Sequence, residues 1–296
     1  MKILLFGKGG QVGWELQRSL APLGDVLALD HDSTDYCGNF SNPAGLLDTV
    51  RDVKPDIIVN AAAHTAVDKA ESEPELVRML NALTPGLLAQ EAQRLGAWFV
   101  HYSTDYVFDG SGVSAWTETD TPAPLSVYGQ TKFEGEKLIQ TACTQHLIFR
   151  TSWVYAARGG NFARTMLRLA QERDRLTVID DQIGAPTGAE LLADVTAHAL
   201  RQVWRRPAEA GLYHLAASGE TSWWGYARHV LAQAKRLQPD LQLKATEVLA
   251  VPTSAFATAA QRPHNSRLDT RKLQATFDLH LPSWQEGVNR MLAETL

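Results

Sequence analysis

KILLFGKGGQVG, residues 2–13, combines a short apolar run with three regularly spaced glycines. The apolar run is typical of a buried strand. Gly7 would permit a sharp turn out of that strand, Gly10 would let the backbone approach a pyrophosphate, and Gly13 would let the next helix pack closely. The amides at the start of that helix would face the phosphates. The pattern predicts a dinucleotide-binding loop, and a glycine-rich turn without a ligand is the alternative.

Four further apolar runs in the first half of the chain have the length of strands, and helical patterns lie between them. The runs are Val26–Asp30, Asp56–Ala62, Trp98–Ser103 and His146–Arg150. This alternation produces right-handed βαβ units and a parallel sheet with helices on both faces. We therefore expect the α/β class, with a doubly wound, Rossmann-like parallel sheet that binds ligands at the carboxyl ends of its strands.

The alternation stops after residue 150. Loops rich in glycine, proline and threonine then separate helices predicted near 161–172, 189–204 and 222–236. We expect residues 1–150 to form the dinucleotide-binding domain and residues 151–296 to form mainly a smaller, irregular substrate-binding domain. A helix followed by the short strand Leu212–Leu215 predicts that a segment near 187–217 returns to the main sheet.

The composition of the 296 residues indicates a folded protein, because 45% are hydrophobic and 21% are charged. The formal net charge of -5 includes no basic block, so nucleic acid is not an expected partner. Two cysteines, Cys37 and Cys143, fit a reducing compartment. No apolar stretch approaches the roughly 20 residues that span a bilayer, so we expect a cytoplasmic protein without a membrane partner.

Asp30 ends the second predicted strand, 20 residues after Gly10. A carboxylate at this position can accept hydrogen bonds from an adenosine ribose and would repel a 2′-phosphate. The alternative is that Asp30 caps a turn beside His31 and Asp32. We expect NADH to be accepted, while the use of NADPH stays open.

Three side chains further along the chain form a catalytic pattern. Thr104 lies where the fourth predicted strand ends, and Tyr128 follows 24 residues later, with Lys132 four residues beyond it in a helical pattern. Residues four apart share a helix face, so the ammonium of Lys132 would lie near the phenol and lower its pKa. Tyr128 would then donate a proton while Thr104 orients the substrate oxygen. A Tyr-x-x-x-Lys pair alone is usually structural, but together with the glycine loop it predicts reduction of a keto group by a reduced nicotinamide.

Several long motifs in the same order make the chain resemble the extended short-chain dehydrogenase/reductase family and, within it, the dTDP-4-dehydrorhamnose reductases. The motifs are FGKGGQVG at 6–13, NAAAHTAVD at 60–68, STDYVFDG at 103–110, YGQTK at 128–132, RTSWVY at 150–155, DQIGAPT at 181–187, and Arg262-Pro263 with Asn265-Ser266. They extend over essentially the whole chain. The resemblance implies reduction of the C4 keto group of dTDP-6-deoxy-L-lyxo-4-hexulose to dTDP-L-rhamnose, with NADPH or NADH as the hydride donor.

The same resemblance implies two sets of binding residues. The cofactor set is Gly7, Gly10, Gln11, Val12, Gly13, Asp30, Asn39, Phe40, Ala63, His64, Thr65, Tyr102, Tyr128 and Lys132. The substrate set is Val67, Thr104, Asp105, Trp153 and Arg262. For Trp153 the alternative is simple core packing, and for Arg262, which would bind the substrate diphosphate, it is a surface salt bridge. Trp223, Trp224 and Trp284 are expected to pack the second lobe, and Arg150 is expected to join a structural ion pair.

Sugar-nucleotide dehydratases on the same fold commonly carry Asp-Glu directly after the strand-end threonine. Here the two positions are Asp105 and Tyr106. A phenol is a poor substitute for that glutamate, so keto reduction is favoured over dehydration.

Family members that hold Mg²⁺ between subunits suggest a homodimer in which Glu15, Glu190 and Glu294 bind the ion, with three solvated glutamates as the alternative. Two other functions stay open. The chain could be a non-catalytic regulatory subunit that binds a sugar nucleotide or dinucleotide, or a reductase or epimerase of another nucleotide sugar.

Overall fold

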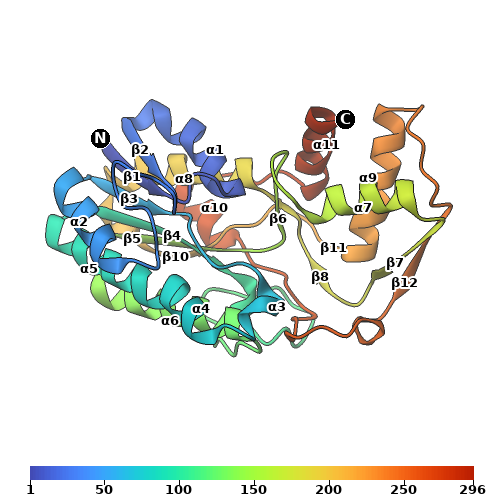
Figure 1. Ribbon diagram of the computed structural model, residues 1–296, viewed down its shortest axis with the longest axis horizontal. Coiled ribbons are helices and arrows are strands. Elements are labelled where there is room, and N and C mark those ends of the chain that lie inside the picture. The colour runs from blue at the N-terminus through green and yellow to red at the C-terminus, as the bar shows by residue number, and fades with distance from the viewer.

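The computed structural model describes residues 1–296 and places a six-stranded parallel sheet in the larger of two lobes (Figure 1). The strands lie in the order β10-β5-β4-β3-β1-β2. Their bounds are β1 (Lys2–Phe6), β2 (Asp25–Leu29), β3 (Ile57–Asn60), β4 (Trp98–Thr104), β5 (His146–Thr151) and β10 (Gly211–His214). The expected α/β class and doubly wound parallel sheet are confirmed.

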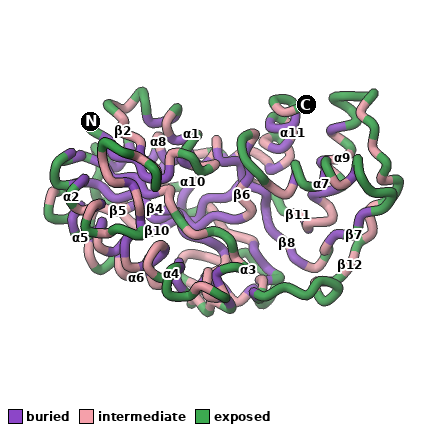
Figure 2. Tube along the Cα trace, in the orientation of Figure 1, coloured by how far each residue is buried: buried purple, intermediate pink, exposed green.

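The inner strands of the sheet are buried (Figure 2). The sheet is covered on both faces, because its side chains alternate between two hydrophobic clusters. In β1, Ile3 and Leu5 enter one cluster, while Leu4 and Phe6 enter the other. The first cluster is covered by α1 (Gln11–Leu20), α8 (Ala189–Val203) and α10 (Arg271–Phe277), and the second by α2 (Pro43–Val53), α5 (Thr84–Leu95) and α6 (Val127–Ala142).

Five of the six strands differ from their predicted bounds by one or two residues at an end, and the differences in β3 and β2 change how the chain leaves the sheet at the ligand edge. The predicted strand Asp56–Ala62 is shorter, because the Asn60 side chain accepts a hydrogen bond from the Ala62 amide at 2.9 Å and turns the chain away. β2 ends at Leu29, which leaves Asp30 as the first residue of the following loop.

The smaller lobe is built from helices and three two-stranded sheets. Its helices are α7 (Phe162–Glu172), α9 (Trp223–Leu237) and α11 (Trp284–Thr295). The first two lie close to their predicted positions, and α11 was not predicted. Its sheets pair β6 (Val154–Tyr155) with β9 (Thr187–Gly188), β7 (Arg175–Ile179) with β12 (Glu247–Val251), and β8 (Ile183–Gly184) with β11 (Thr221–Ser222). Trp284 is buried in this lobe as expected, and the Trp224 indole donates to the Val248 carbonyl.

Short helical turns complete the chain. They are η1 (Ala21–Leu23), α3 (Val67–Ala70), α4 (Pro74–Arg78), the π-helical turn η2 (Met79–Leu83), η3 (Asp105–Val107), η4 (Pro207–Glu209) and η5 (Thr253–Ala255). None of the helices combines the length and the apolarity that crossing a membrane requires.

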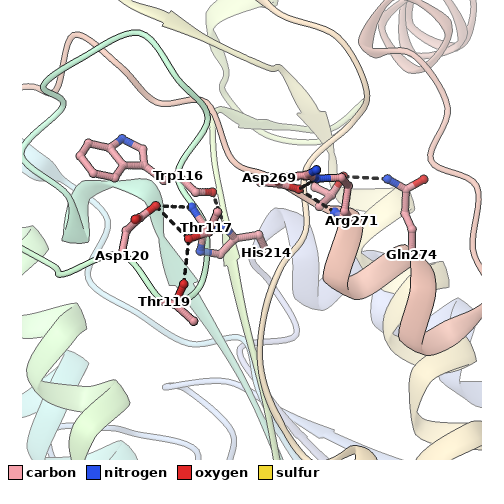
Figure 3. Close-up of polar contacts among 9 residues, drawn as sticks. Trp116, Thr117, Thr119, Asp120, His214, Asp269, Arg271 and Gln274 are labelled. Atoms are coloured by element: carbon pink, nitrogen blue, oxygen red, sulfur yellow. Dashed lines mark hydrogen bonds and ion pairs between the residues drawn. The ribbon is translucent and has the colours of Figure 1, made fainter.

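β10 pairs in parallel with β5, although it follows much of the smaller lobe in the sequence. Its last residue, His214, lies beside the turn from Trp116 to Asp120 (Figure 3), and its ring Nδ1 is 3.0 Å from the Trp116 carbonyl oxygen. Burial and the nearby Arg150 lower the pKa of His214 to about 3, so the ring is neutral and donates from Nδ1. Arg150 itself forms the expected structural ion pair, a buried two-point contact with Glu136 at 2.9 and 2.7 Å.

Candidate active site

The loop after β1 has the shape that a dinucleotide requires. Gly7 has a φ of 85°, and a Cβ there would lie 2.7 Å from the Ala62 nitrogen. A Cβ on Gly13 would lie 1.9 Å from the Gly7 carbonyl oxygen. Glycine is therefore required for the turn at Gly7 and for the close contact of α1 with the loop at Gly13. Gly10 is the N-cap of α1, so the first helical amides are open toward the pocket.

One pocket lies above the carboxyl ends of β1 and β2. Its lining includes six predicted cofactor residues, Gly7, Gly10, Asp30, Asn39, Phe40 and Ala63, together with Gly38, Ser41 and Leu80. The Asp30 carboxylate accepts the Gly9 amide and the His31 amide, each at 2.9 Å. Although burial acts to raise it, these hydrogen bonds hold the pKa of Asp30 below its usual value. Asp30 thus caps the loop, which was the alternative interpretation. It also presents a carboxylate to the pocket, as the predicted ribose contact requires.

A second pocket continues from the first across Gly10, Ala61 and Ala63, which line both. The predicted residues that line it are Gln11, Val12, Ala63, Thr65, Val67, Tyr102, Thr104, Asp105, Tyr128, Lys132 and Trp153. The structure therefore brings together residues from the ends of β3, β4 and β5 and from the start of α6. Helix α6 begins at Val127 because the Ser126 side chain accepts the Gly129 amide at 3.2 Å, and this cap points Tyr128 and Lys132 into the pocket.

Tyr128 is hydrogen-bonded to Thr104 and packs edge-on against Tyr106, with ring centroids 5.6 Å apart. Burial raises the pKa of Tyr128 to about 12, and the Thr104 hydrogen bond only partly opposes this. The sequence predicts that Lys132 lowers the pKa of this phenol, and the structure differs. The Lys132 Nζ donates to the Tyr102 carbonyl at 2.5 Å, and burial lowers the pKa of Lys132 to about 8. The phenol of Tyr128 stays protonated because its own burial raises its pKa.

Asp105 follows Thr104 and is buried in the same pocket. Its Oδ1 accepts a hydrogen bond from the Thr104 hydroxyl at 3.1 Å, whereas its buried Oδ2 has no hydrogen-bond partner. Burial outweighs the hydrogen bonding and raises the pKa of Asp105 to about 6. A carboxyl group in this state can either accept or donate a hydrogen bond to a sugar hydroxyl near neutral pH.

The wall opposite α6 is aromatic. Trp153 has a left-handed backbone, with a φ of 49°, and its ring stacks on Trp223. Gly184 leaves room for this ring, because a Cβ there would lie 2.8 Å from it. Trp223 packs against the hydrophobic clusters of the smaller lobe, as predicted, and it also lines the pocket, which the sequence did not predict.

Three predicted residues, Gly13, His64 and Arg262, line neither pocket. His64 stands between the lining residues Ala63 and Thr65, but its ring Nε2 lies 3.6 Å from Glu73. Arg262 makes a two-point ion pair with Asp68, at 3.1 and 2.6 Å, so it adopts the salt bridge that the sequence left as the alternative.

The three glutamates predicted to bind a metal are neighbours but do not converge. Glu15 pairs with Arg18 at 3.3 Å, and Glu294 pairs with Arg290 at 3.0 Å. Burial raises the pKa of Glu190, and the charges of Glu15 and Glu294 raise it further. The group whose ligand atoms all lie within 4.8 Å of one another is instead the exposed loop Asp30, His31 and Asp32.

Sequence reasoning missed several lining residues, namely Ser103, Tyr106, Thr151, Ser152, Val154 and Trp223. Ser103, Thr151 and Ser152 lie at the carboxyl ends of β4 and β5, so the rule that locates ligands at those ends contains the signal for them. Trp223 is the first residue of α9, where no motif distinguishes a pocket residue from a core residue.

Comparison with known proteins agrees with this geometry. The model of the family described as RmlD substrate binding domain matches residues 1–296. A dTDP-4-dehydrorhamnose reductase of Escherichia coli K12 is 62% identical over 294 residues, covering 99% of this chain and 98% of the relative. A dTDP-4-dehydrorhamnose reductase of Salmonella typhimurium has the same identity and coverage.

Among solved structures, the dTDP-4-dehydrorhamnose reductase of Bacillus anthracis in complex with NADP is 34% identical, with a TM-score of 0.88 and 99% coverage of both chains. The glycine loop, the strand-end threonine and the Tyr128 and Lys132 pair thus occur in a chain that matches these reductases from end to end. The chain belongs to the dTDP-4-dehydrorhamnose reductase family.

Proposed function

We propose that this protein reduces the C4 keto group of dTDP-6-deoxy-L-lyxo-4-hexulose, yielding dTDP-L-rhamnose, with NADPH or NADH as the reductant. One observation carries the proposal. Thr104, Tyr128 and Lys132 line a pocket that runs on, past Gly10 and Ala63, into a pocket bounded by the carboxylate of Asp30. The two pockets together accommodate a dinucleotide with its reactive end beside the phenol.

Tyr128 is the proposed proton donor to the substrate oxygen. Burial keeps this phenol protonated, and its hydrogen bond with Thr104 fixes its position. Thr104 would anchor the same oxygen, and Lys132 would hold the nicotinamide ribose. The reduced nicotinamide, when bound, supplies the hydride.

The residues on the other side of the reacting carbon would select the sugar. We propose that Val67, Asp105 and Trp153 border it, because all three line the pocket that contains Tyr128. Asp105 offers hydrogen bonds and Trp153 offers an apolar ring face, a combination that suits a deoxysugar with one hydrophobic side.

The test is an NAD(P)H-oxidation assay with several keto-sugar nucleotides, on wild type and Tyr128→Phe. Phenylalanine keeps the ring and removes the proton, so turnover should fall by about 10²–10⁴ while cofactor binding is nearly unchanged. Wild-type turnover in Tyr128→Phe would refute the mechanism. A wild type that is inert on every substrate would instead favour the non-catalytic, ligand-binding alternative.

We further propose that residues 1–150, with the returning segment near 187–217, form the dinucleotide-binding domain and that the rest of 151–296 forms the substrate-binding domain. The pairing of β10 with β5, and the shared core of α1 and α8, support this division. Hydrogen exchange should protect the amides of β10 as strongly as those of β5, and protection only at the level of the small sheets would contradict it.

A homodimer that binds Mg²⁺ through Glu15, Glu190 and Glu294 is also proposed. Burial raises the pKa of Glu190, and the charges of Glu15 and Glu294 raise it further, which supports the proposal because a divalent cation would offset both effects. Sedimentation with Mg²⁺ or with EDTA tests the idea on wild type and Glu190→Gln. An unchanged mass in all conditions would leave the three glutamates as surface charge.

A further inference from the structure

Thr151, the last residue of β5, carries a hydroxyl group that is buried without a hydrogen-bond partner. The residue is 7% exposed and lines the pocket that contains Tyr128. Its Oγ1 forms no hydrogen bond with any other part of the protein. A buried polar group left unpaired destabilises a fold, and valine would fill the same space without that cost. An unpaired hydroxyl on a pocket wall therefore points to a polar group on a bound ligand.

Thr151 faces the side of the sheet opposite α6. In β5, Phe149 belongs to the cluster covered by α1 and α8, whereas Ile148 belongs to the cluster covered by α6. Because side chains alternate along a strand, Thr151 shares the face of Phe149. Tyr128 and Lys132 reach the same pocket from α6, on the other face. The pocket is thus lined from both faces of the sheet, with the catalytic residues on one face and the free hydroxyl on the other.

The pocket wall on the Thr151 face of the sheet is largely apolar. Val12 and Val154 line the pocket and pack against the cluster of this face. The hydroxyls of Tyr102 and Ser152, which also line the pocket, each have a protein partner, at 2.7 and 3.2 Å. Thr151 therefore presents a free hydroxyl beside apolar side chains. A flat ring that bears a single amide matches such a wall, whereas a sugar carries hydroxyl groups all around its ring.

The strand order places Thr151 at the nicotinamide end of the dinucleotide that we propose. Asp30 follows β2, the glycine loop with Gly10 follows β1, and the Tyr102 carbonyl that accepts from Lys132 belongs to β4. Strand β5 is the next one along the sheet. A dinucleotide that starts at Asp30 and passes Gly10 and Lys132 would therefore extend to Thr151. The ring at that end has one polar substituent, a carboxamide, which both donates and accepts hydrogen bonds.

We propose that the Thr151 hydroxyl binds the nicotinamide carboxamide and so fixes the rotation of the ring beside Tyr128. The inference rests on the proposed function, which supplies the cofactor. A threonine hydroxyl has one hydrogen to donate and two lone pairs, so it can bond to the oxygen or to the NH₂ group of the carboxamide. The ring can otherwise rotate about its bond to the ribose. A hydrogen bond to its single polar substituent restrains that rotation and holds the reactive carbon toward the substrate.

Equilibrium binding of reduced dinucleotides to the protein without substrate tests this contact and needs no turnover. The probes are NADH and two analogues, one with a thionicotinamide, which replaces the carboxamide oxygen by sulfur, and one with a 3-acetylpyridine, which replaces the NH₂ group by methyl. Quenching of the protein fluorescence gives Kd for each. Wild type should bind at least one analogue about three- to tenfold more weakly than NADH, which is the effect of losing one hydrogen bond.

Thr151→Val keeps the shape of the side chain and removes the hydroxyl. It should bind NADH about three- to tenfold more weakly than wild type and no longer distinguish NADH from that analogue. Thr151→Ser keeps the hydroxyl and should keep the preference. Ser103→Ala is the matched control, because the Ser103 hydroxyl is also buried and unpaired in this pocket but lies on the α6 face, with Phe99. A preference that is absent in wild type, persists in Thr151→Val or disappears in Ser103→Ala would overturn the proposal.

Steady-state kinetics separate a contact with the cofactor from a contact with the sugar. At saturating NADH, Thr151→Val should lower kcat by about tenfold, because the ring is less well oriented, while KM for the keto sugar stays within about twofold of wild type. An unchanged kcat, or a rise in that KM with the analogue preference retained, would overturn the proposal, and the second result would assign Thr151 to the substrate. If the Kd values behave as expected but wild type reduces no keto-sugar nucleotide, the proposed function fails and the carboxamide contact stands.

Discussion

Trp153 and Trp223 stack face to face, with ring centroids 3.7 Å apart and ring planes 16° from parallel, although they lie 70 residues apart in the sequence. Trp153 follows β5 of the main sheet, whereas Trp223 is the first residue of α9. A left-handed backbone costs a non-glycine residue about 1–3 kcal/mol, and Trp153 adopts one. The stack helps to offset this cost and makes the two indoles one wall of the pocket.

Trp223→Ala should therefore weaken substrate binding although it leaves the Tyr128 end of the pocket intact. An aromatic pair contributes about 0.5–1.5 kcal/mol beyond buried area, so we expect KM for the nucleotide sugar to rise up to about tenfold, with a smaller change in kcat. Circular dichroism should lose the exciton signal of the stacked indoles. Trp224→Ala, which removes an indole bonded to Val248 outside the pocket, is the matched control. A retained exciton signal, or an equal rise in KM in the control, would contradict the role of Trp223.

Asp30 should govern which nicotinamide cofactor is preferred. Its carboxylate lines the pocket above β1 and β2 and would repel a 2′-phosphate. Wild type is expected to oxidise NADH, and Asp30→Asn should raise the ratio of kcat/KM for NADPH over NADH by about tenfold, or ~1.4 kcal/mol. Asp32→Asn, at an exposed neighbour, should leave this ratio unchanged. Negligible wild-type turnover with NADH would show that the role assigned to Asp30 is wrong.

Asp105 should make the protein less stable as the pH rises. Burial raises the pKa of this carboxyl group to about 6, so the folded state holds the proton more tightly than the unfolded chain does. The resulting stabilisation is complete below the unfolded pKa near 3.9 and is lost as the pH rises through 6. Asp105→Asn cannot ionise, so its free energy of unfolding should exceed that of wild type by about 2–3 kcal/mol at pH 7.5 and match it below pH 4.

Urea unfolding between pH 4 and 8 measures this difference. Asp109→Asn is a control with the opposite sign, because hydrogen bonds from Ser111 lower the pKa of Asp109 and its carboxylate stabilises the fold at higher pH. A constant difference between Asp105→Asn and wild type across this range would mean that Asp105 does not titrate as described.

The buried ion pair between Arg150 and Glu136 should be costly to break on one side only. Glu136→Gln leaves the Arg150 guanidinium buried without its counter-charge, so we expect a loss of about 3–5 kcal/mol in the free energy of unfolding. The double variant Glu136→Met with Arg150→Met removes both charges and should recover most of that loss. The single variants Glu136→Met and Arg150→Met complete the comparison. If the loss in the double variant equals the sum of the losses in these two single variants, the pair is not coupled as the structure indicates.

The main sheet was predictable because its signals are local. Residues 2–13 carry a strand and a glycine loop in sequence order, and Tyr128 and Lys132 share a helix face by spacing alone. The stack of Trp153 on Trp223 was not predictable, because it joins residues 70 apart through the placement of two lobes. The pKa of Tyr128 was predicted in the wrong direction, because spacing shows that Lys132 is near but does not reveal burial or that the Tyr102 carbonyl and His101 engage its Nζ.

The position of β10 sets the order in which the main sheet is completed during synthesis. Until Gly211 to His214 have left the ribosome, β5 is an edge strand with unpaired backbone groups, and such edges recruit other chains. Translation at about 5–20 residues per second leaves roughly 3–12 s between the end of β5 and the start of β10. The growing chain therefore passes through an interval in which an open sheet edge must be kept from neighbouring nascent chains. The residues of α10 that cover that sheet, Leu273 and Phe277, arrive later still, followed by Leu281.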